Sequence, residues 1–336
     1  VSTTELPFTT GSGGYGLGLQ NQERSIVRSG DALVFSSSAP IIEADQYVGE
    51  RAAIEVVDLS EPGAPAHAGT LARPDGIAHG ALQQQGDELY SWHMRAVDGD
   101  TARVRFYFDR FDVSSPSEPD ALAPVNVPGQ VVAFDDASDR VVAVGFQREE
   151  IDEPEQGCWS HPKSWGHDYD SDTCYIAHRP LHLLQLVDGG AALLDTLDVE
   201  GDATRLSAVM ASEDRVFALV TEREQYYWDD EGGVPQDYEP PTDTLAVVTG
   251  HHGDDLREGG RVVLDRGGWT TLLGVTGTRA TYRSNVGLGF VDASDANAPE
   301  TTLAETLGWG CYDALVTEDA VYCPLGEYGL QVIPTP

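Results

Sequence analysis

The chain has 336 residues, of which 40% are hydrophobic, so it is long enough to bury a large core. Its 56 acidic residues outnumber 20 basic ones, and the net charge is −36. This charge argues against nucleic acids and anionic membrane surfaces as partners, because both are bound through Lys and Arg. The longest apolar runs are far shorter than the roughly 18 to 20 residues that span a bilayer, so we expect no membrane-spanning helix.

Hairpin patterns recur along the chain from the N-terminus onward. In each, two alternating apolar stretches flank a turn rich in Gly, Asp, Ser, Glu or Thr, which is typical of a β-hairpin. No stretch of useful length has helical periodicity. The six hairpins are expected at residues 25–37, 80–93, 131–146, 206–221, 271–284 and 312–324.

A second pattern follows three of these hairpins, in VVDLSEPGAP, RFDVSSPSEP and GFVDASDANAP. An apolar residue precedes Asp, Ser follows two positions later, and Pro follows seven positions after the Asp. The carboxylate can accept hydrogen bonds from the turn that follows, and the Pro ends strand pairing. Short strands are expected next, at 66–71, 121–127 and 301–307. The motif residues are Asp58, Ser60 and Pro65; Asp112, Ser114 and Pro119; and Asp292, Ser294 and Pro299.

Degenerate copies of this motif complete a set of six units, at Val187-Asp188, Val248-Thr249 and Val332-Ile333. Six four-stranded units predict an all-β fold, a six-bladed β-propeller in one domain over residues 1–336. A β-solenoid has shorter repeats, and a pair of β-sandwiches does not explain six recurrences. The last unit ends after its third strand, so we expect the N-terminal strand VSTTELPF to complete the last blade.

The Asp-x-Ser motif resembles that of the LVIVD-repeat β-propellers, secreted or surface proteins of bacteria and archaea. The resemblance covers most of the chain as architecture, although the sharp motif occupies three of the six units. It implies a propeller fold and an exported protein, and it supplies no catalytic residues.

The cysteines are Cys158, Cys174, Cys311 and Cys323, and none forms a CxxC pair, which excludes zinc-ribbon and thioredoxin-like sites. Two local bridges, 158–174 and 311–323, are the most economical of three pairings. Disulfides would place the protein in the periplasm, outside the cell or on its surface; the alternative is four reduced thiols in the cytosol. The chain begins with Val1, so we expect a trimmed chain whose export signal or membrane anchor lies in a missing N-terminal segment.

Irregular stretches separate the second and third strands of four blades, and these positions share one face of a propeller. They are 39–51, 95–102 and the two long loop insertions 147–174 and 221–243. Long loops are uncommon without a role, so two of them in adjacent blades mark the expected functional face.

Asp168, Asp170 and Asp172 alternate as in the first half of a calcium loop. Thr173 and Arg179 stand where an EF-hand needs its glycine and its last acidic ligand, so this is not an EF-hand. Calcium is the one cofactor the pattern would suit, and a solvated acidic turn is the alternative. Histidines in and after this loop match no zinc-protease spacing.

Aromatic and ionisable side chains gather in the two long loops and where the first and second blades join. Aromatic rings beside carboxylates suit a sugar, a cationic group or a basic peptide, and they also suit a loop that packs on itself. We expect Trp92 and His93 at the end of a strand on the loop face. The candidate binding residues are Trp159, His161, Trp165, His167, Tyr226, Tyr227, Trp228, Asp229, His79 and His93.

No nucleophile elbow, phosphate-binding loop or dinucleotide fingerprint is present. The sequence therefore favours a secreted, non-catalytic binding or scaffold propeller over an enzyme, with a protein, cationic or carbohydrate ligand on its loop face. One alternative is a metal-assisted hydrolase or lyase at the central channel, using His79, His93 and loop carboxylates. Another is a structural subunit of an envelope assembly.

Overall fold

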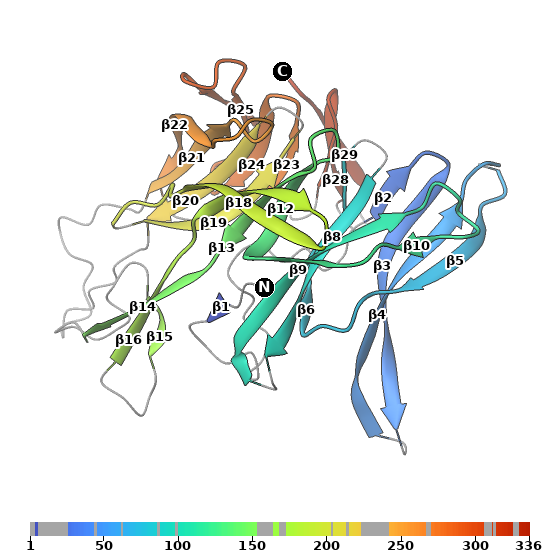
Figure 1. Cartoon of the computed structure of the whole chain (residues 1–336). Coiled ribbons are helices and arrows are strands. Elements are labelled where there is room, and N and C mark those ends of the chain that lie inside the picture. The colour runs from blue at the N-terminus through green and yellow to red at the C-terminus, as the bar shows by residue number, and fades with distance from the viewer. Residues whose placement is uncertain are drawn as a thin grey trace. The chain divides into compact units, whose positions relative to one another are not determined.

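The computed structural model describes residues 4–5, 26–43, 46–61, 63–85, 88–97, 100–152, 164–167, 173–202, 204–212, 215–222, 242–266, 270–305, 311, 314–324 and 329–336. In this part of the chain every regular element is a strand, and no helix is present that could span a membrane. The strands form six antiparallel blades, which confirms the predicted all-β, six-bladed β-propeller (Figure 1). The chain divides into two compact units, Val1–Phe146 with Leu184–Leu194 and Gln147–Leu183 with Asp195–Pro336.

Blade 1 contains β2 (Ile26–Ser29), β3 (Ala32–Glu43), β4 (Gln46–Asp58) and β5 (Ala66–Ala72), paired in that order. The pairing of β3 with β4 continues from Ala32 opposite Asp58 to Glu43 opposite Gln46 (Figure 1). Most of 39–51, expected to be a loop, is therefore a long β-hairpin. Its β-branched and aromatic residues favour an extended backbone, and the polar residues between them obscured the alternation.

Blade 2 is built around the paired strands β8 (Glu88–Val97) and β9 (Asp100–Asp112), and the described residues of 95–102 belong to these two strands. The first strand of the blade is interrupted: β6 (Ala78–His79) and β7 (Gln83–Gln85) both pair with β8. Its outer strand is interrupted too, because β10 (Asp120–Ala121) and β11 (Val125–Val127) both pair with β9.

The N-terminal strand joins blade 2. Thr4 and Glu5, which form β1 (Thr4–Glu5), pair with Val104 and Arg103 of β9. The outer strand β11 pairs with β9 only as far as Phe106, so the edge of β9 beyond that residue is open to another strand. The prediction that VSTTELPF completes the last blade is wrong, because this open edge takes the strand instead.

Blade 3 contains β12 (Gly129–Asp135), β13 (Arg140–Gly145), β17 (Leu181–Val187) and β18 (Gly190–Leu197). Every residue of β12 is buried, as expected of a strand covered on both faces. The insertion at 147–174 begins a separate sheet, in which β16 (Thr173–His178) lies between β14 (Gln147–Asp152) and β15 (Ser164–His167). Part of that expected loop is thus regular structure.

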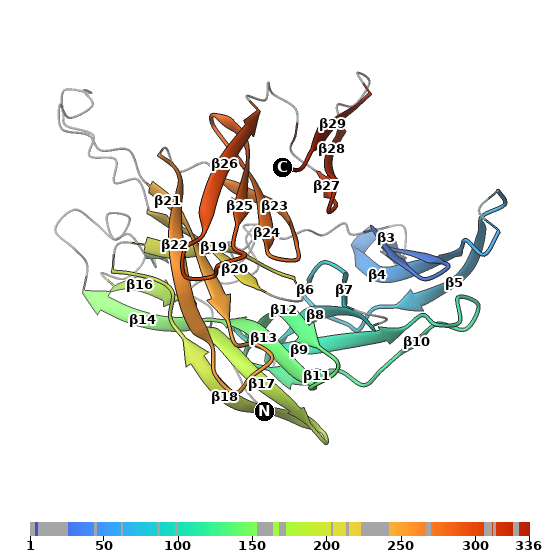
Figure 2. The same cartoon turned by 90° about the horizontal axis from the view of Figure 1, so that it is seen from above.

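Blade 4 contains β19 (Thr204–Ala211), β20 (Val216–Glu222), β21 (Thr242–Thr249) and β22 (Arg257–Arg266). Blade 5 contains β23 (Thr271–Thr276), β24 (Arg279–Ser284), β25 (Gly287–Asp292) and β26 (Glu300–Glu305), side by side in Figure 2. In blade 6 the described residues supply three strands, β27 (Leu315–Val316), β28 (Ala320–Pro324) and β29 (Leu330–Pro334). All six predicted hairpins are confirmed.

The repeated motif forms the same turn in each of its three copies. The backbone N–H of the motif Ser donates to the Asp carboxylate at 2.8 Å in Asp58–Ser60, 2.9 Å in Asp112–Ser114 and 2.8 Å in Asp292–Ser294. Hydrogen bonds from the motif Ser hold the pKa of both Asp58 and Asp112 below the ordinary value. The predicted turn chemistry is confirmed.

The motif prolines also join neighbouring blades. Pro119 of blade 2 lies against Gly69 in the outer strand of blade 1, and Pro299 of blade 5 lies against Gly260 in the outer strand of blade 4. In the second case the N–H of Gly260 also donates to the carbonyl of Ala296 at 2.7 Å. In these two copies the motif fastens a turn of one blade to the edge of the preceding blade.

Disulfides tie two parts of the second unit. The predicted bridge between Cys311 and Cys323 is confirmed, and both residues are buried in a core with Phe290 of blade 5. Cys174 of β16 is also disulfide-bonded and fully buried. Its predicted partner, Cys158, lies outside the described residues.

Candidate functional site

A polar site lies on the β8–β9 hairpin of blade 2, beneath the segment 73–80 that connects blades 1 and 2. Register places Ser91 opposite Asp109 and His93 opposite Tyr107. Because side chains alternate between the faces of a strand, these four residues share one face of the hairpin. The expectation that Trp92 and His93 end a strand is wrong: β8 continues to Val97, and both residues are buried within it.

His93 and Asp109 form a buried pair at the centre of this face. Nδ1–H of His93 donates to the two carboxylate oxygens of Asp109, each at 2.8 Å. The two side chains are 0% and 2% exposed. Nε2, the other nitrogen of the His93 ring, has no hydrogen-bond partner among the described residues.

Arg73 adds a buried cation to the pair. Its guanidinium donates to the carbonyl of Gly80 at 2.9 Å and to the hydroxyl of Ser91. Burial lowers the pKa of Arg73 to about 10, and the negative charge of Asp109 acts in the opposite direction. The cation and the carboxylate therefore partly compensate for each other's loss of water.

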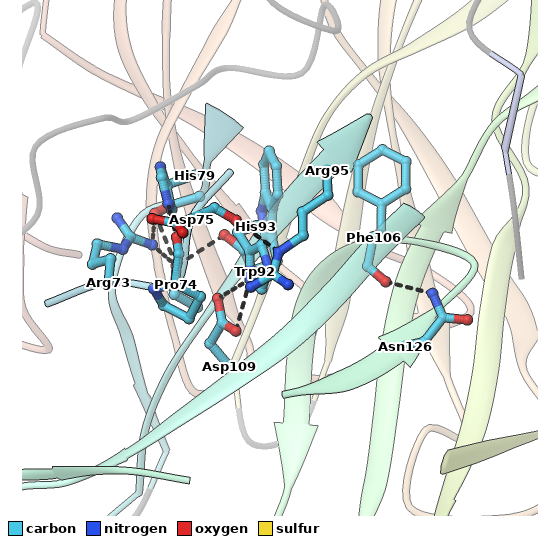
Figure 3. Close-up of polar contacts among 12 residues, drawn as sticks. Arg73, Pro74, Asp75, His79, Trp92, His93, Arg95, Phe106, Asp109 and Asn126 are labelled. Atoms are coloured by element: carbon cyan, nitrogen blue, oxygen red, sulfur yellow. Dashed lines mark hydrogen bonds and ion pairs between the residues drawn. The ribbon is translucent and has the colours of Figure 1, made fainter. Parts of the chain in front are cut away.

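The connecting segment is held tightly against β8, as Figure 3 shows for Arg73, Pro74 and His79. Nε2–H of His79 donates to the carbonyl of Pro74 at 2.8 Å, and the N–H of Gly80 donates to the carbonyl of Trp92 at 2.8 Å. A Cβ at Gly80 would lie 2.2 Å from Nε1 of Trp92, so only glycine allows this approach. Burial lowers the pKa of His79, although the bond to Pro74 opposes the shift.

The outer end of the same face carries Arg95. Its Nε–H donates to the carbonyl of Asp75 at 2.7 Å, and its Cζ lies 5.3 Å from the centre of the Tyr107 ring. That ring stacks on His93, with centroids 4.8 Å apart and an interplanar angle of 9°. One continuous group of contacts therefore runs from Asp109 to the exposed Arg95.

The structure brings together two of the residues singled out from sequence. The rings of His79 and His93 are 6.1 Å apart, although His93 is fully buried. Trp165 and His167 lie on β15, and their side chains are outside the described residues. The other candidate binding and metal-ligating residues also lie outside them: Trp159, His161, Asp168, Asp170, Asp172, Tyr226, Tyr227, Trp228 and Asp229.

Sequence reasoning missed Arg73, Ser91, Tyr107 and Asp109. A usable signal for Asp109 was present in RFYFDRFD, where a carboxylate interrupts a run of aromatic residues in a strand. A charge at such a position is expected to have a buried partner. Across the part of the chain that the structure describes, no three His, Cys, Asp or Glu residues are placed to hold a metal ion.

A second polar cluster lies on the surface of blade 1. The Glu55 carboxylate accepts from the hydroxyl of Thr70 at 2.6 Å, from Nε2 of His67 at 2.9 Å and from the hydroxyl of Ser37 at 3.0 Å. These contacts, led by Thr70 and His67, lower the pKa of Glu55. The cluster is open to water, so its bonds are worth less than those of the buried pair.

Comparison with known proteins finds no matching family model and no curated protein that matches the chain. The resemblance to LVIVD-repeat proteins therefore stays a prediction. Among solved structures, the N-terminal domain of Nup159 is 12% identical with a TM-score of 0.37, over 98% of this chain and 90% of that chain.

Two enzyme structures are similarly distant. A mutant Trypanosoma rangeli sialidase displaying trans-sialidase activity is 10% identical with a TM-score of 0.36, over 98% of this chain and 56% of that chain. The GH43 endo-arabinanase from Bacillus licheniformis is 9% identical with a TM-score of 0.29, over 84% of this chain and 94% of that chain. Likenesses this weak carry no argument about function.

Proposed function

We propose that the chain is a secreted or cell-surface, non-catalytic binding or scaffold propeller that presents acidic and aromatic loops to a protein or cationic ligand. The observation that carries this proposal is the burial of the His93–Asp109 pair. A catalytic acid or base must reach the substrate, and these side chains are 0% and 2% exposed. Their contacts instead stabilise the hairpin and the segment 73–80.

The anchored segment is suited to binding because it is both rigid and accessible. Asp75 and Ile77 are exposed, while Arg73 and Gly80 at the two ends of the segment are buried. A surface segment that is already ordered loses less conformational entropy when a partner binds. By holding the segment 73–80 in place, the buried charges of the site favour binding of a partner to the exposed residues of this segment.

Charge supports a basic or cationic partner. The net charge of −36 attracts cations, and β14 adds the exposed side chains of Glu149, Glu150 and Asp152.

The disulfides at Cys311–Cys323 and Cys174 support an oxidising compartment. Together, the negative charge and the disulfides favour binding of a basic partner outside the cytosol.

Binding of a fluorescent Lys- and Arg-rich decapeptide tests the proposal by anisotropy at 0.05 M and 0.2 M salt. We expect binding that weakens as salt rises, and no binding of a decapeptide of matched length rich in Glu. Changing Asp168, Asp170 and Asp172 together to Asn should weaken peptide binding at least fivefold. Lack of binding to the basic peptide would contradict the proposal.

A matched control removes the same charge elsewhere. Glu61 and Glu118 are exposed on motif turns, and Glu300 is exposed at the start of β26. Their change to Gln also removes three negative charges. In the assay at 0.2 M salt we expect this variant to bind within about twofold of the wild type, since at that salt concentration exposed charges are largely screened beyond about 8 Å. An equal loss in both variants would mean that net charge alone, and not the loop, attracts the peptide.

A metal-assisted hydrolase or lyase is a second candidate, favoured by Nε2 of His93, which has no hydrogen-bond partner among the described residues. A histidine whose Nδ1–H is held by a carboxylate is the usual arrangement of a metal ligand. Elemental analysis of the protein after incubation with Zn²⁺ and removal of free metal tests this candidate. Bound metal that is lost in His93→Gln would support it, and metal-free protein would eliminate it.

A further inference from the structure

The outer edge of β9 accepts an added strand near the start of β9. The regular outer strand, β11, pairs with β9 only as far as Phe106. Past that point β1 takes the outer position, with Thr4 opposite Val104 and Glu5 opposite Arg103 (Figure 1). A strand edge presents backbone N–H and C=O groups in a row, and an extended peptide binds to such an edge as one more strand. The pairing with β1 shows that this edge is suited to strand addition.

The strand that takes this position is short. β1 pairs with β9 at two positions, whereas the part of β9 that β11 does not cover extends over 100–105. A pairing of two residues near a chain end contributes few ladder hydrogen bonds, and such ends open with a free energy close to zero. A longer extended segment makes more backbone hydrogen bonds with the same edge. It is therefore able to displace β1.

The residues along this edge indicate which segment fits it. Arg103 is exposed, and opposite charges that face each other across a strand pair stabilise it. The resident strand follows this rule, because its register places Glu5 opposite Arg103. Val104 is fully buried, so the residue opposite Val104 belongs to the packed face of the sheet, where a β-branched residue is favoured. The edge therefore suits a β-branched residue followed by an acidic one.

We propose that the outer edge of β9 at 100–105 binds an extended, acidic segment of another protein, which adds as an antiparallel strand in place of β1. Backbone hydrogen bonds supply the affinity, and an acidic residue opposite Arg103 fixes the register. β1 is then an internal competitor, so only a segment that pairs better than β1 binds. This site is separate from the proposed function, because that function concerns a basic or cationic partner at the loops.

Fluorescence anisotropy with the labelled peptide VSTTELPF at about 0.15 M salt tests the site. Thr4→Pro and Glu5→Pro, made together in the full chain, remove both N–H groups of β1, and pairing in a ladder needs such groups. We expect this proline variant to bind the peptide at least tenfold more tightly than the wild type, whose own strand competes at a high effective concentration. Failure of the folded proline variant to bind, or equal binding by both proteins, overturns the proposal.

An exchange of charge assigns the binding to Arg103. In the proline variant, Arg103→Glu should weaken binding of VSTTELPF at least threefold and should strengthen binding of the Glu5→Lys peptide. Arg28 is the matched control, because it is exposed on β2 and Arg28→Glu changes the net charge equally. Arg28→Glu should change the affinity for either peptide by less than twofold. Equal effects of the two arginine variants would mean that net charge alone governs binding, which contradicts the assignment.

The unmodified chain supplies a test that needs no variant to fold. An excess of VSTTELPF should displace β1, so amide hydrogen exchange at Thr4 and Glu5 should become faster. Unchanged exchange at a peptide concentration about a hundredfold above the Kd of the proline variant would refute displacement. Sedimentation of the wild type examines a second copy as the occupant. Dimers that the proline variant does not form would show that a second copy supplies the strand, and would overturn the assignment to another protein.

Discussion

Replacing Asp109 tests whether the His93–Asp109 pair holds the site together. Asp109→Ala removes the acceptor of the His93 Nδ1–H bonds and the negative charge that compensates buried Arg73. Removal of one partner from a buried ion pair costs about 3–5 kcal/mol, because the remaining charge stays buried. Asp109→Asn keeps an oxygen in the same position but no charge, so we expect a smaller loss of about 1.5–3 kcal/mol.

Urea denaturation at pH 7, followed by tryptophan fluorescence and far-UV circular dichroism, measures both losses. Trp92 is buried next to His93 and should report on this region. At a slope of about 3 kcal/mol per molar urea, a loss of 3 kcal/mol lowers the midpoint by about 1 M. Agreement between the two probes would show that the loss is one of overall stability.

A more exposed histidine–carboxylate pair at the same distance supplies the control. His178 and Glu149 are also 2.8 Å apart, but their side chains are 27% and 56% exposed. Glu149→Ala should cost less than about 1 kcal/mol, as exposed ion pairs do. If Asp109→Ala costs no more than Glu149→Ala, then burial does not set the strength of the His93 pair and the reasoning is refuted.

Three further changes test other parts of the fold. Changing Cys311 and Cys323 together to Ser opens a loop with a sequence separation of 12 and should cost about 3 kcal/mol in urea, whereas an unchanged midpoint would contradict this. Glu55→Gln should be less stable than the wild type at pH 7, because the folded protein lowers the pKa of Glu55 and so favours its charged form. This difference in stability should fade as the pH falls below the ordinary pKa of 4.5. A difference that is the same at pH 3 would contradict a lowered pKa. Gly260→Ala places a Cβ 2.5 Å from a proline ring and should cost about 1–3 kcal/mol, while Gly190→Ala meets no neighbour within 4 Å and should be nearly neutral in the same melts.

The blades could be predicted because their signals are local. The alternation of apolar residues and the turn chemistry around Asp58, Asp112 and Asp292 operate over ten residues or fewer. Such a pattern is complete within one unit, so its recurrence along the chain is enough to count the blades. The pairing of Cys311 with Cys323 could be predicted for the same reason, since the two residues are close in sequence.

The site could be predicted only in part. His79 and His93 were identified as ionisable residues near a blade junction, but nothing in the chain order showed that His93 is buried against Asp109, sixteen residues away. Strand register decides which side chains share a face, and a shift of one residue would place Asp109 on the opposite side. The same holds for β1, whose partner depends on which strand edge stays open.

The sequence by itself determined that this is an acidic, all-β protein of six repeated units with a disulfide near its C-terminus. These properties follow from composition, period and turn chemistry, which act between neighbouring residues. Only the tertiary structure decided that Arg73, His93 and Asp109 are buried together while Arg95 remains at the surface. Burial depends on what packs over each face of a strand, and that is set by contacts between residues far apart in the chain.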